Sequence, residues 1–232
     1  DKVIGVPKEM MTEGLSSDVK AAVEKALAIY SEQGAQIVEV SLPTLPYALA
    51  AYYLIATSEA SSNLARFDGV RYGHRSEQSG NLMDLYLNSR SEGFGHEVKL
   101  RIMLGTFALS SGYYDAYYLK AQKARALLIR DTHKAFEQCD VMMAPTAPVT
   151  AFKLGERLKD PLQMYSTDIL TVMANLTGIP ALSLPCGLSD GLPVGLQIMG
   201  KPMAEAEVYQ MAFAYEQATQ WHHLTPSGLD AQ

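Results

Sequence analysis

Cysteine is scarce in this sequence, and its scarcity argues against several classes of protein. Cys139 and Cys186 are the only two cysteines among 232 residues, and they stand far apart without a Cys-x-x-Cys spacing. This usage predicts no disulfide framework and favours a reducing compartment, the cytoplasm. The five histidines show neither a His-Glu-x-x-His motif nor a paired cysteine spacing, so we expect no metal site.

Long apolar runs are missing as well. No stretch approaches the roughly 20 apolar residues that span a membrane, and no secretory signal opens the chain, so we expect no membrane partner. The chain begins with Asp1 rather than Met, which we interpret as the start of a partial chain. The net charge of −6 argues against a broad nucleic-acid-binding surface. With 48% hydrophobic and 19% charged residues, the composition is that of an ordinary globular protein.

The first forty residues predict a strand, a helix and a second strand. Residues 2–7 read as a short buried strand, and residues 36–42 alternate as a second one. Between them, Ser16 to Asp18 offer a helix N-cap and Gly34 a stop. The helix should bury Val19, Val23, Ala26, Leu27 and Tyr30. A crossover of this length makes a βαβ unit, so the fold class is α/β.

The middle of the chain is predicted to be a large helical insertion. Residues of roughly 46–138 read almost entirely as helix, interrupted at glycine-rich positions. The sheet should resume after it, in the order strand 140–144, helix 168–177, strands 181–184 and 195–199 joined by a tight loop at 188–193, and helix 205–220. We expect one domain over residues 1–232, a mixed β-sheet flanked by helices, with a loosely held tail from about residue 221.

A helical hairpin at residues 93–125 carries a cation in an unexpected place. At helical period, the first half aligns apolar side chains and one glycine on one face, namely Phe94, Val98, Ile102, Gly105 and Leu109. Arg101 falls on the same stripe. An inward guanidinium is costly unless an anion meets it, so this position predicts either a ligand or an internal ion pair with Glu92 or Asp115.

Three stretches carry a resemblance to a known family. These are LRIMLGTFALSSGYYDAYYLKAQKAR at residues 100–125, SEASSNLARFDGVRYGHR at 58–75 and APTAPVTAF at 144–152. They resemble the C-terminal half of the amidase signature family, and within it the A subunits of tRNA-dependent amidotransferases. The resemblance runs from Asp1 to about His222. It implies the C-terminal portion of the amidase signature fold.

The resemblance also implies which parts of the enzyme this chain lacks. The family's Lys–cis-Ser–Ser triad lies in a Gly/Ser-rich signature region upstream, and no GGSSGGS-like run occurs in these residues. We therefore expect no catalytic residue here and no activity from this chain alone. The parent enzyme would release ammonia from glutamine. The B and C subunits would be its partners, and tRNA would be reached indirectly through the B subunit. ATP and Mg²⁺ would serve the partner subunit, and this chain would hold no cofactor.

Three residues match the family's glutamine-binding positions. By resemblance, Arg101 binds the α-carboxylate of glutamine, Asp168 receives its α-ammonium group, and Tyr52 lines the pocket. From the residues alone, Asp168 also fits ordinary chemistry in the first turn of a helix after a Thr N-cap. Tyr52 equally fits a packed tyrosine with a satisfied hydroxyl.

Two other functions stay open at this point. One is another amidase of the same family, acting on an amide without the two charges of an amino acid. The Arg101 and Asp168 pair argues against it, because a neutral substrate would leave both charges unserved. The other is a non-catalytic scaffold that docks partner subunits, which the 11 methionines permit without requiring it.

Overall fold

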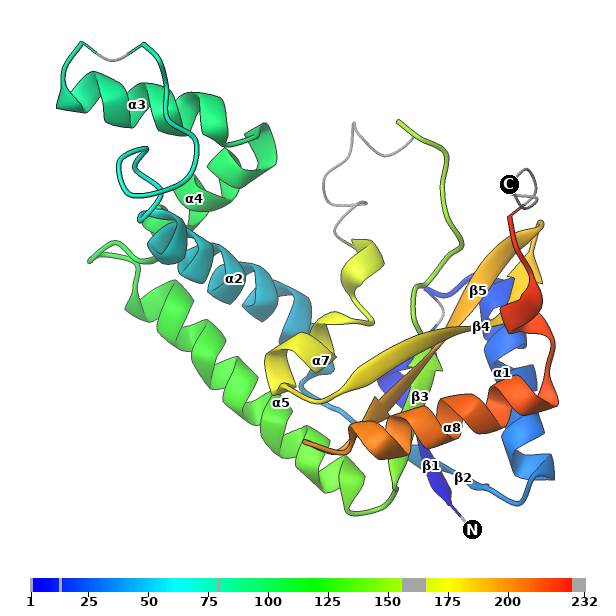
Figure 1. Ribbon diagram of the computed structural model, residues 1–232. Coiled ribbons are helices and arrows are strands. Elements are labelled where there is room, and N and C mark those ends of the chain that lie inside the picture. Colours follow the sequence, from blue (N-terminus) through cyan, green and yellow to red (C-terminus); the bar gives the residue numbers. More distant parts are fainter. Residues whose placement is uncertain (1, 13, 79, 156–165, 227–232) are drawn as a thin grey trace. The chain divides into compact units, whose positions relative to one another are not determined.

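The computed structural model describes residues 2–12, 14–78, 80–155 and 166–226 (Figure 1). The chain forms two compact units, one of Asp1–Leu49 with Arg125–Gln232 and the other of Ala50–Ala124. We call them the sheet unit and the helical unit and describe each by itself. The single domain with an insertion at about residues 46–138 stays a prediction.

A five-stranded mixed sheet forms the centre of the sheet unit, in the order β2-β1-β3-β5-β4. Its strands are β1 (Val3–Pro7), β2 (Gln36–Val40), β3 (Val141–Pro145), β4 (Ala181–Ser189) and β5 (Leu192–Gly200). β1 runs parallel to β2 and β3, whereas β5 is antiparallel to β3 and β4. Helix α1 (Ser17–Glu32) joins β1 to β2 as the expected βαβ unit. The predicted α/β class with a mixed sheet flanked by helices is confirmed.

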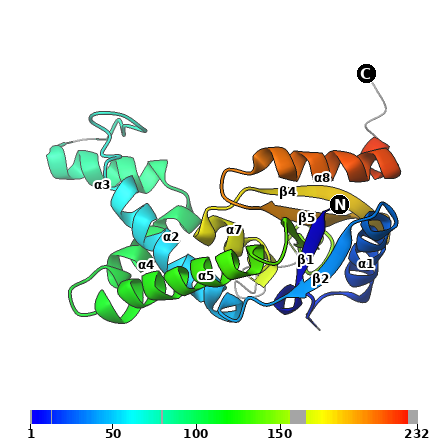
Figure 2. The ribbon, with the colours of Figure 1, turned by 90° about the horizontal axis from the view of Figure 1, so that it is seen from below.

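One face of this sheet carries an apolar core. Side chains of a strand alternate between faces, and every second residue of β3, β4 and β5 is buried here. These strand residues are Val141, Met143, Leu184, Cys186, Val194, Leu196 and Ile198. Helix α1 covers them with the five residues predicted for it, and α8 (Glu205–Ala218) adds Val208, Met211, Ala212 and Tyr215. Figure 2 shows α8 lying along β4 and β5.

The two covering helices also contact each other. The rings of Tyr30 on α1 and Tyr215 on α8 stack with centroids 5.5 Å apart. The Tyr30 hydroxyl donates to the Met211 carbonyl at 2.9 Å. At the start of α1, Ser16 Oγ accepts the Val19 amide at 3.3 Å, which is the N-cap that the sequence predicts.

The last two strands form a longer hairpin than expected. The sequence predicts a loop at 188–193, but β4 continues to Ser189 and β5 starts at Leu192. Only Asp190 (φ 51°) and Gly191 (φ 77°) remain as the turn. Two consecutive residues with positive φ match the right-handed twist of the flanking strands, which is why so short a connection suffices.

The helical unit is built from helices that follow one another along the chain. They are α2 (Ala48–Leu64), which begins in the sheet unit, α3 (Leu82–Gly93), α4 (His96–Ala108), the π-helical turn η3 (Asp115–Leu119) and α5 (Lys120–Phe136), which ends in the sheet unit. α4 crosses α2 closely at Gly105, where an added Cβ would lie 2.0 Å from the Thr57 carbonyl oxygen. The Ser61 and Thr106 hydroxyls hydrogen-bond beside this crossing at 2.8 Å.

Short elements complete the described chain. They are the 3-10 turns η1 (Lys8–Met10), η2 (Leu45–Tyr47), η4 (Ser166–Asp168) and η5 (Trp221–His223), and helix α7 (Val172–Thr177). The tail predicted from about residue 221 therefore starts with η5, and its residues 227–232 lie outside the described part. Within the described ranges, no helix combines the length and apolar character that a membrane crossing requires.

Candidate functional site

A pair of hydroxyls stands at the end of β3 in the sheet unit. Thr146 Oγ1 and Ser183 Oγ lie 2.6 Å apart. Gly195 on β5 leaves room for them, because an added Cβ would come within 2.8 Å of Thr146 Oγ1 and 2.9 Å of Ser183 Oγ. Only a glycine fits at this close approach.

Two cavities of about 370 Å³ each share this hydroxyl pair in their walls. Leu184, Pro193 and Val194 help to line the first cavity, together with the loop that follows β3. The second cavity is more polar, because Thr171, Asn175 and Gln197 contribute to its lining. This second cavity is the better candidate for a polar ligand in the sheet unit, since several hydrogen-bonding groups converge on it.

Asp168 lies in the turn that leads to the second cavity. Its carbonyl accepts two hydrogen bonds from Thr171, one from the amide at 3.0 Å and one from Oγ1 at 3.1 Å. The predicted helix at 168–177 is therefore shorter than expected: α7 starts at Val172, and Asp168 belongs to the separate turn η4. The Asp168 side chain is exposed. The turn thus links Asp168 to Thr171 in the cavity wall.

Gln197 fixes the same turn from the sheet. It is 3% exposed on β5, and its Nε2 donates to the Leu170 carbonyl at 3.0 Å. Gln197, Thr146 and Ser183 were not predicted from the sequence. The signal for Gln197 was a lone amide in an otherwise apolar strand run, since buried polar side chains need a partner.

Tyr52 lies on α2 in the helical unit. Its side chain is half-buried, and its ring meets that of Tyr53 edge-on, with centroids 5.3 Å apart and planes at 75°. The partly accessible ring agrees with either interpretation of Tyr52, a pocket wall or a packed aromatic.

Arg101 on α4 corrects the sequence-based expectation. It does not face inward among apolar side chains: its side chain is 47% exposed. Its Nε pairs with Glu97 Oε1 at 3.2 Å, one helical turn away. The expected ion pair with Glu92 or Asp115 is therefore wrong. Helical period predicted a face but not how far a long charged side chain extends to water. An exposed pair of this kind is weak, so the guanidinium can exchange its partner for another anion.

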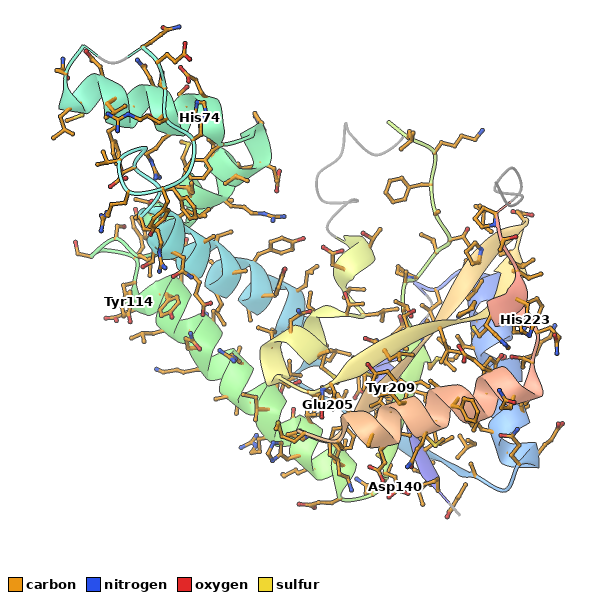
Figure 3. The ribbon with its side chains drawn as sticks, in the orientation of Figure 1. His74, Tyr114, Asp140, Glu205, Tyr209 and His223 are labelled. Carbon is orange, nitrogen blue, oxygen red and sulfur yellow. The ribbon has the colours of Figure 1, made fainter. Side chains whose placement is uncertain are left out.

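Glu92 belongs to a different polar group beside α3. His74, labelled in Figure 3, has its Nε2 2.8 Å from Glu92 Oε2. The Ser76 hydroxyl donates to Glu92 Oε1 at 2.8 Å, and the Ser76 amide donates to Ser89 Oγ at 3.0 Å. The hydrogen bond from His74 and then that from Ser76 hold the pKa of the Glu92 carboxyl below its usual value.

The cysteines do not suit nucleophilic chemistry. Both thiols are buried, and burial raises the pKa of Cys139 to about 11 and that of Cys186 to about 12. The thiolate is the reactive form, so both are inert near neutral pH. Ser110 donates from Oγ to the Phe107 carbonyl at 2.8 Å at the end of α4, as suits a serine at a helix C-terminus. Among the described residues, no group of three or more His, Cys, Asp or Glu side chains could hold a metal ion.

Comparison with known proteins gives the relatives of this chain. The family model described as Amidase matches residues 1–209. The glutamyl-tRNA(Gln) amidotransferase A subunit of Geobacillus thermodenitrificans (strain NG80-2) is 60% identical over 223 residues, which cover 96% of this chain and 46% of that protein. The same subunit from Oceanobacillus iheyensis is 59% identical over 224 residues, with the same shares covered. This chain therefore spans less than half the length of the curated relatives it matches.

Solved structures agree with this relationship. The crystal structure of the glutamyl-tRNA(Gln) amidotransferase A subunit from Thermotoga maritima superposes with a TM-score of 0.72 at 38% identity, covering 94% of this chain and 42% of that one. 6-Aminohexanoate cyclic dimer hydrolase shares the fold at 20% identity, with a TM-score of 0.75 over 99% of this chain and 47% of its own. This chain, whose residues 1–209 match the family model, belongs to the amidase signature family.

Proposed function

We propose that this chain is the glutamine-recognising portion of the glutaminase subunit, the A subunit, of a tRNA-dependent amidotransferase. The observation that carries the proposal is the 60% identity to such subunits over 96% of the chain. The complete protein would release ammonia from glutamine in the cytoplasm. The B and C subunits would be its partners, and a partner would use ATP and Mg²⁺ to convert Glu-tRNA(Gln) to Gln-tRNA(Gln). The tRNA would be reached through the B subunit.

Arg101, Asp168 and Tyr52 are the residues to which we assign glutamine. Arg101 would bind the α-carboxylate, Asp168 the α-ammonium group, and Tyr52 would line the pocket. A guanidinium presents donors in a planar fork that matches a carboxylate, so the contact fixes orientation as well as charge. The exposed position of Arg101 and its weak surface pairing with Glu97 support this role, because little is lost when a ligand replaces Glu97.

The nucleophile of the proposed reaction would come from outside these residues. In the proposed enzyme, a serine activated through a cis-serine and a lysine attacks the side-chain amide of glutamine and forms an acyl-enzyme. The residues of this chain would hold glutamine so that its carbonyl meets that serine, and such positioning can lower a barrier by several kcal/mol. Alone, the chain would release no ammonia.

The decisive test is ammonia release from L-glutamine. We would compare the 232-residue chain with a protein that joins it to the upstream half of its relatives, and expect only the joined protein to be active. In the joined protein, Arg101→Ala should raise KM for glutamine about 10- to 100-fold, because it removes a charge-assisted hydrogen-bond pair. Arg71→Ala is the matched control, because Arg71 also forms an exposed ion pair, with Asp68 three residues before it.

Two results would contradict the proposal. Ammonia release by the short chain alone would mean that a nucleophile lies within these residues. A preference of the joined protein for a simple aliphatic amide over glutamine would point to another amidase of the same family.

A further inference from the structure

A side-chain hydrogen bond ties the turn that carries Asp168 to the sheet. Gln197 donates from Nε2 to the Leu170 carbonyl at 3.0 Å, and the residues at both ends are buried, Gln197 to 3% and Leu170 to 5% exposure. The two residues are separated by 27 positions in the sequence. The bond therefore joins two elements that the local chain does not hold together.

Gln197 stands on a strand that is paired along both edges. β5 lies between β3 and β4, and Gln197 is opposite Ala144 on one side and Ser183 on the other. Both neighbours thus fix the backbone from which the amide projects. A donor on an internal strand moves little, so it can set the position of a softer segment.

The segment that it holds is a closed turn. The Asp168 carbonyl accepts from both the amide and the hydroxyl of Thr171, at 3.0 and 3.1 Å. Leu170, within this turn, is held by Gln197. The residues from Asp168 to Thr171 are thus closed by their own hydrogen bonds and fastened at one carbonyl to the sheet.

The bond is also hard to replace. A buried carbonyl that loses its donor remains desolvated without compensation, which costs more than the hydrogen bond itself contributes. Loss of the donor at residue 197 should therefore shift the turn.

We propose that Gln197 is a positioning residue that sets the place of Asp168 for the α-ammonium group of the substrate. This inference rests on the proposed function. It predicts that Gln197 affects substrates that carry an α-amino group more than those that lack one, because it holds the turn that carries Asp168.

The test uses two substrates in the joined protein, L-glutamine and its analogue without the α-amino group, 4-carbamoylbutanoate. Gln197→Met keeps the length and shape of the side chain but removes the donor. We expect KM for glutamine to rise about 3- to 10-fold with kcat unchanged, as fits the loss of one neutral hydrogen bond. The rise in KM with 4-carbamoylbutanoate should be clearly smaller, because Gln197 also lines the second cavity but reaches the α-ammonium group only through Asp168.

Matched variants separate positioning from general damage. Gln210→Met makes the same replacement at an exposed position of α8 and should leave both substrates unaffected. Thr171→Val removes the hydroxyl donor to the Asp168 carbonyl and should mimic Gln197→Met, which keeps the inference testable if Gln197→Met does not fold. Combined with Asp168→Asn, Gln197→Met should add nothing to the KM for glutamine.

The outcomes distinguish the two proposals. If Asp168→Asn leaves the KM for glutamine unchanged, the proposed role of Asp168 fails and this inference with it. If Asp168→Asn raises that KM but Gln197→Met and Thr171→Val do not, only the inference is overturned. An equal loss with both substrates in Gln197→Met would show a general structural role and would also overturn it.

Discussion

Different interactions stabilise the inside of the sheet unit and the inside of the helical unit. In the sheet unit, alternating strand residues and two covering helices bury one continuous apolar cluster. In the helical unit, the buried apolar residues are mostly small, as Ala51, Ala108 and Ala121 show, and the hydroxyl side chains of Ser76 and Ser89 are buried as well. Burial of apolar area stabilises the first unit, whereas specific hydrogen bonds and one close helix crossing matter more in the second.

The surfaces of the two units differ in the same sense. Helices α3 and α4 expose large apolar side chains, including Leu82 and Met83 on α3 and Met103 and Phe107 on α4. The helical unit therefore exposes large apolar side chains of the kind that the sheet unit buries in its core. Polar contacts offset part of the apolar burial that this unit lacks. Arg90, for example, donates to the carbonyls of Leu64 and Phe67 at 2.9 and 3.0 Å. Polar contacts of this kind are directional, so the helical unit should depend more on exact geometry.

The largest expected effect breaks the core of the sheet unit. Ile198→Ala removes a fully buried side chain from β5 and should lower the free energy of unfolding by about 2–5 kcal/mol. Hydrogen exchange read by mass spectrometry should show faster exchange in peptides of β3, β4 and β5. If α3 and α4 lose protection to the same degree, the two units unfold as one, and the predicted single domain is favoured over two independent units.

A smaller effect should break the helical unit alone. Gly105→Ala would place a Cβ 2.0 Å from the Thr57 carbonyl oxygen, so α4 must move away from α2. We expect a loss of about 1–3 kcal/mol from overpacking, which exceeds the helix propensity that alanine gains. Urea unfolding followed by circular dichroism measures it. Gly112→Ala is the control, because nothing lies within 4 Å of its added Cβ; a neutral Gly105→Ala would refute the close crossing.

The smallest effect concerns acid pH and again separates the units. The folded state lowers the pKa of Glu92 below its ordinary value of 4.5, chiefly through His74 and then Ser76. A lowered pKa stabilises the folded state above the unfolded value, so this contribution is lost as pH falls below about 4.5 towards the folded value. Hydrogen exchange around residues 74–76 should accelerate there, and Glu92→Gln should remove that acceleration while strand peptides keep their own pH profile.

Much of the fold could be predicted from periodicity. Val19, Val23 and Tyr30 follow a helical repeat and are buried as expected, because burial on α1 depends on spacing along one element. The hairpin of β4 and β5 was predicted too short, since the turn at Asp190 and Gly191 needs only two residues.

The candidate site was harder to predict from periodicity than the fold. Arg101 was assigned by resemblance, and the period of α4 wrongly suggested that it faces inward. The bond from Gln197 to Leu170 could not be predicted, because it depends on how a strand and a distant turn pack. Contacts of this kind follow from the tertiary structure rather than from local preference.

The two-residue turn at Asp190 and Gly191 has a consequence far from its own position. Side chains alternate along β5, so the length of this turn decides which residues point to each face of the sheet. One inserted residue that shifted β5 by a single position would turn the Gln197 amide into the apolar core and place an apolar neighbour beneath Leu170. The length of the turn at Asp190 and Gly191 therefore determines which residue of β5 faces Leu170. It thereby decides whether Gln197 can bond the turn that carries Asp168.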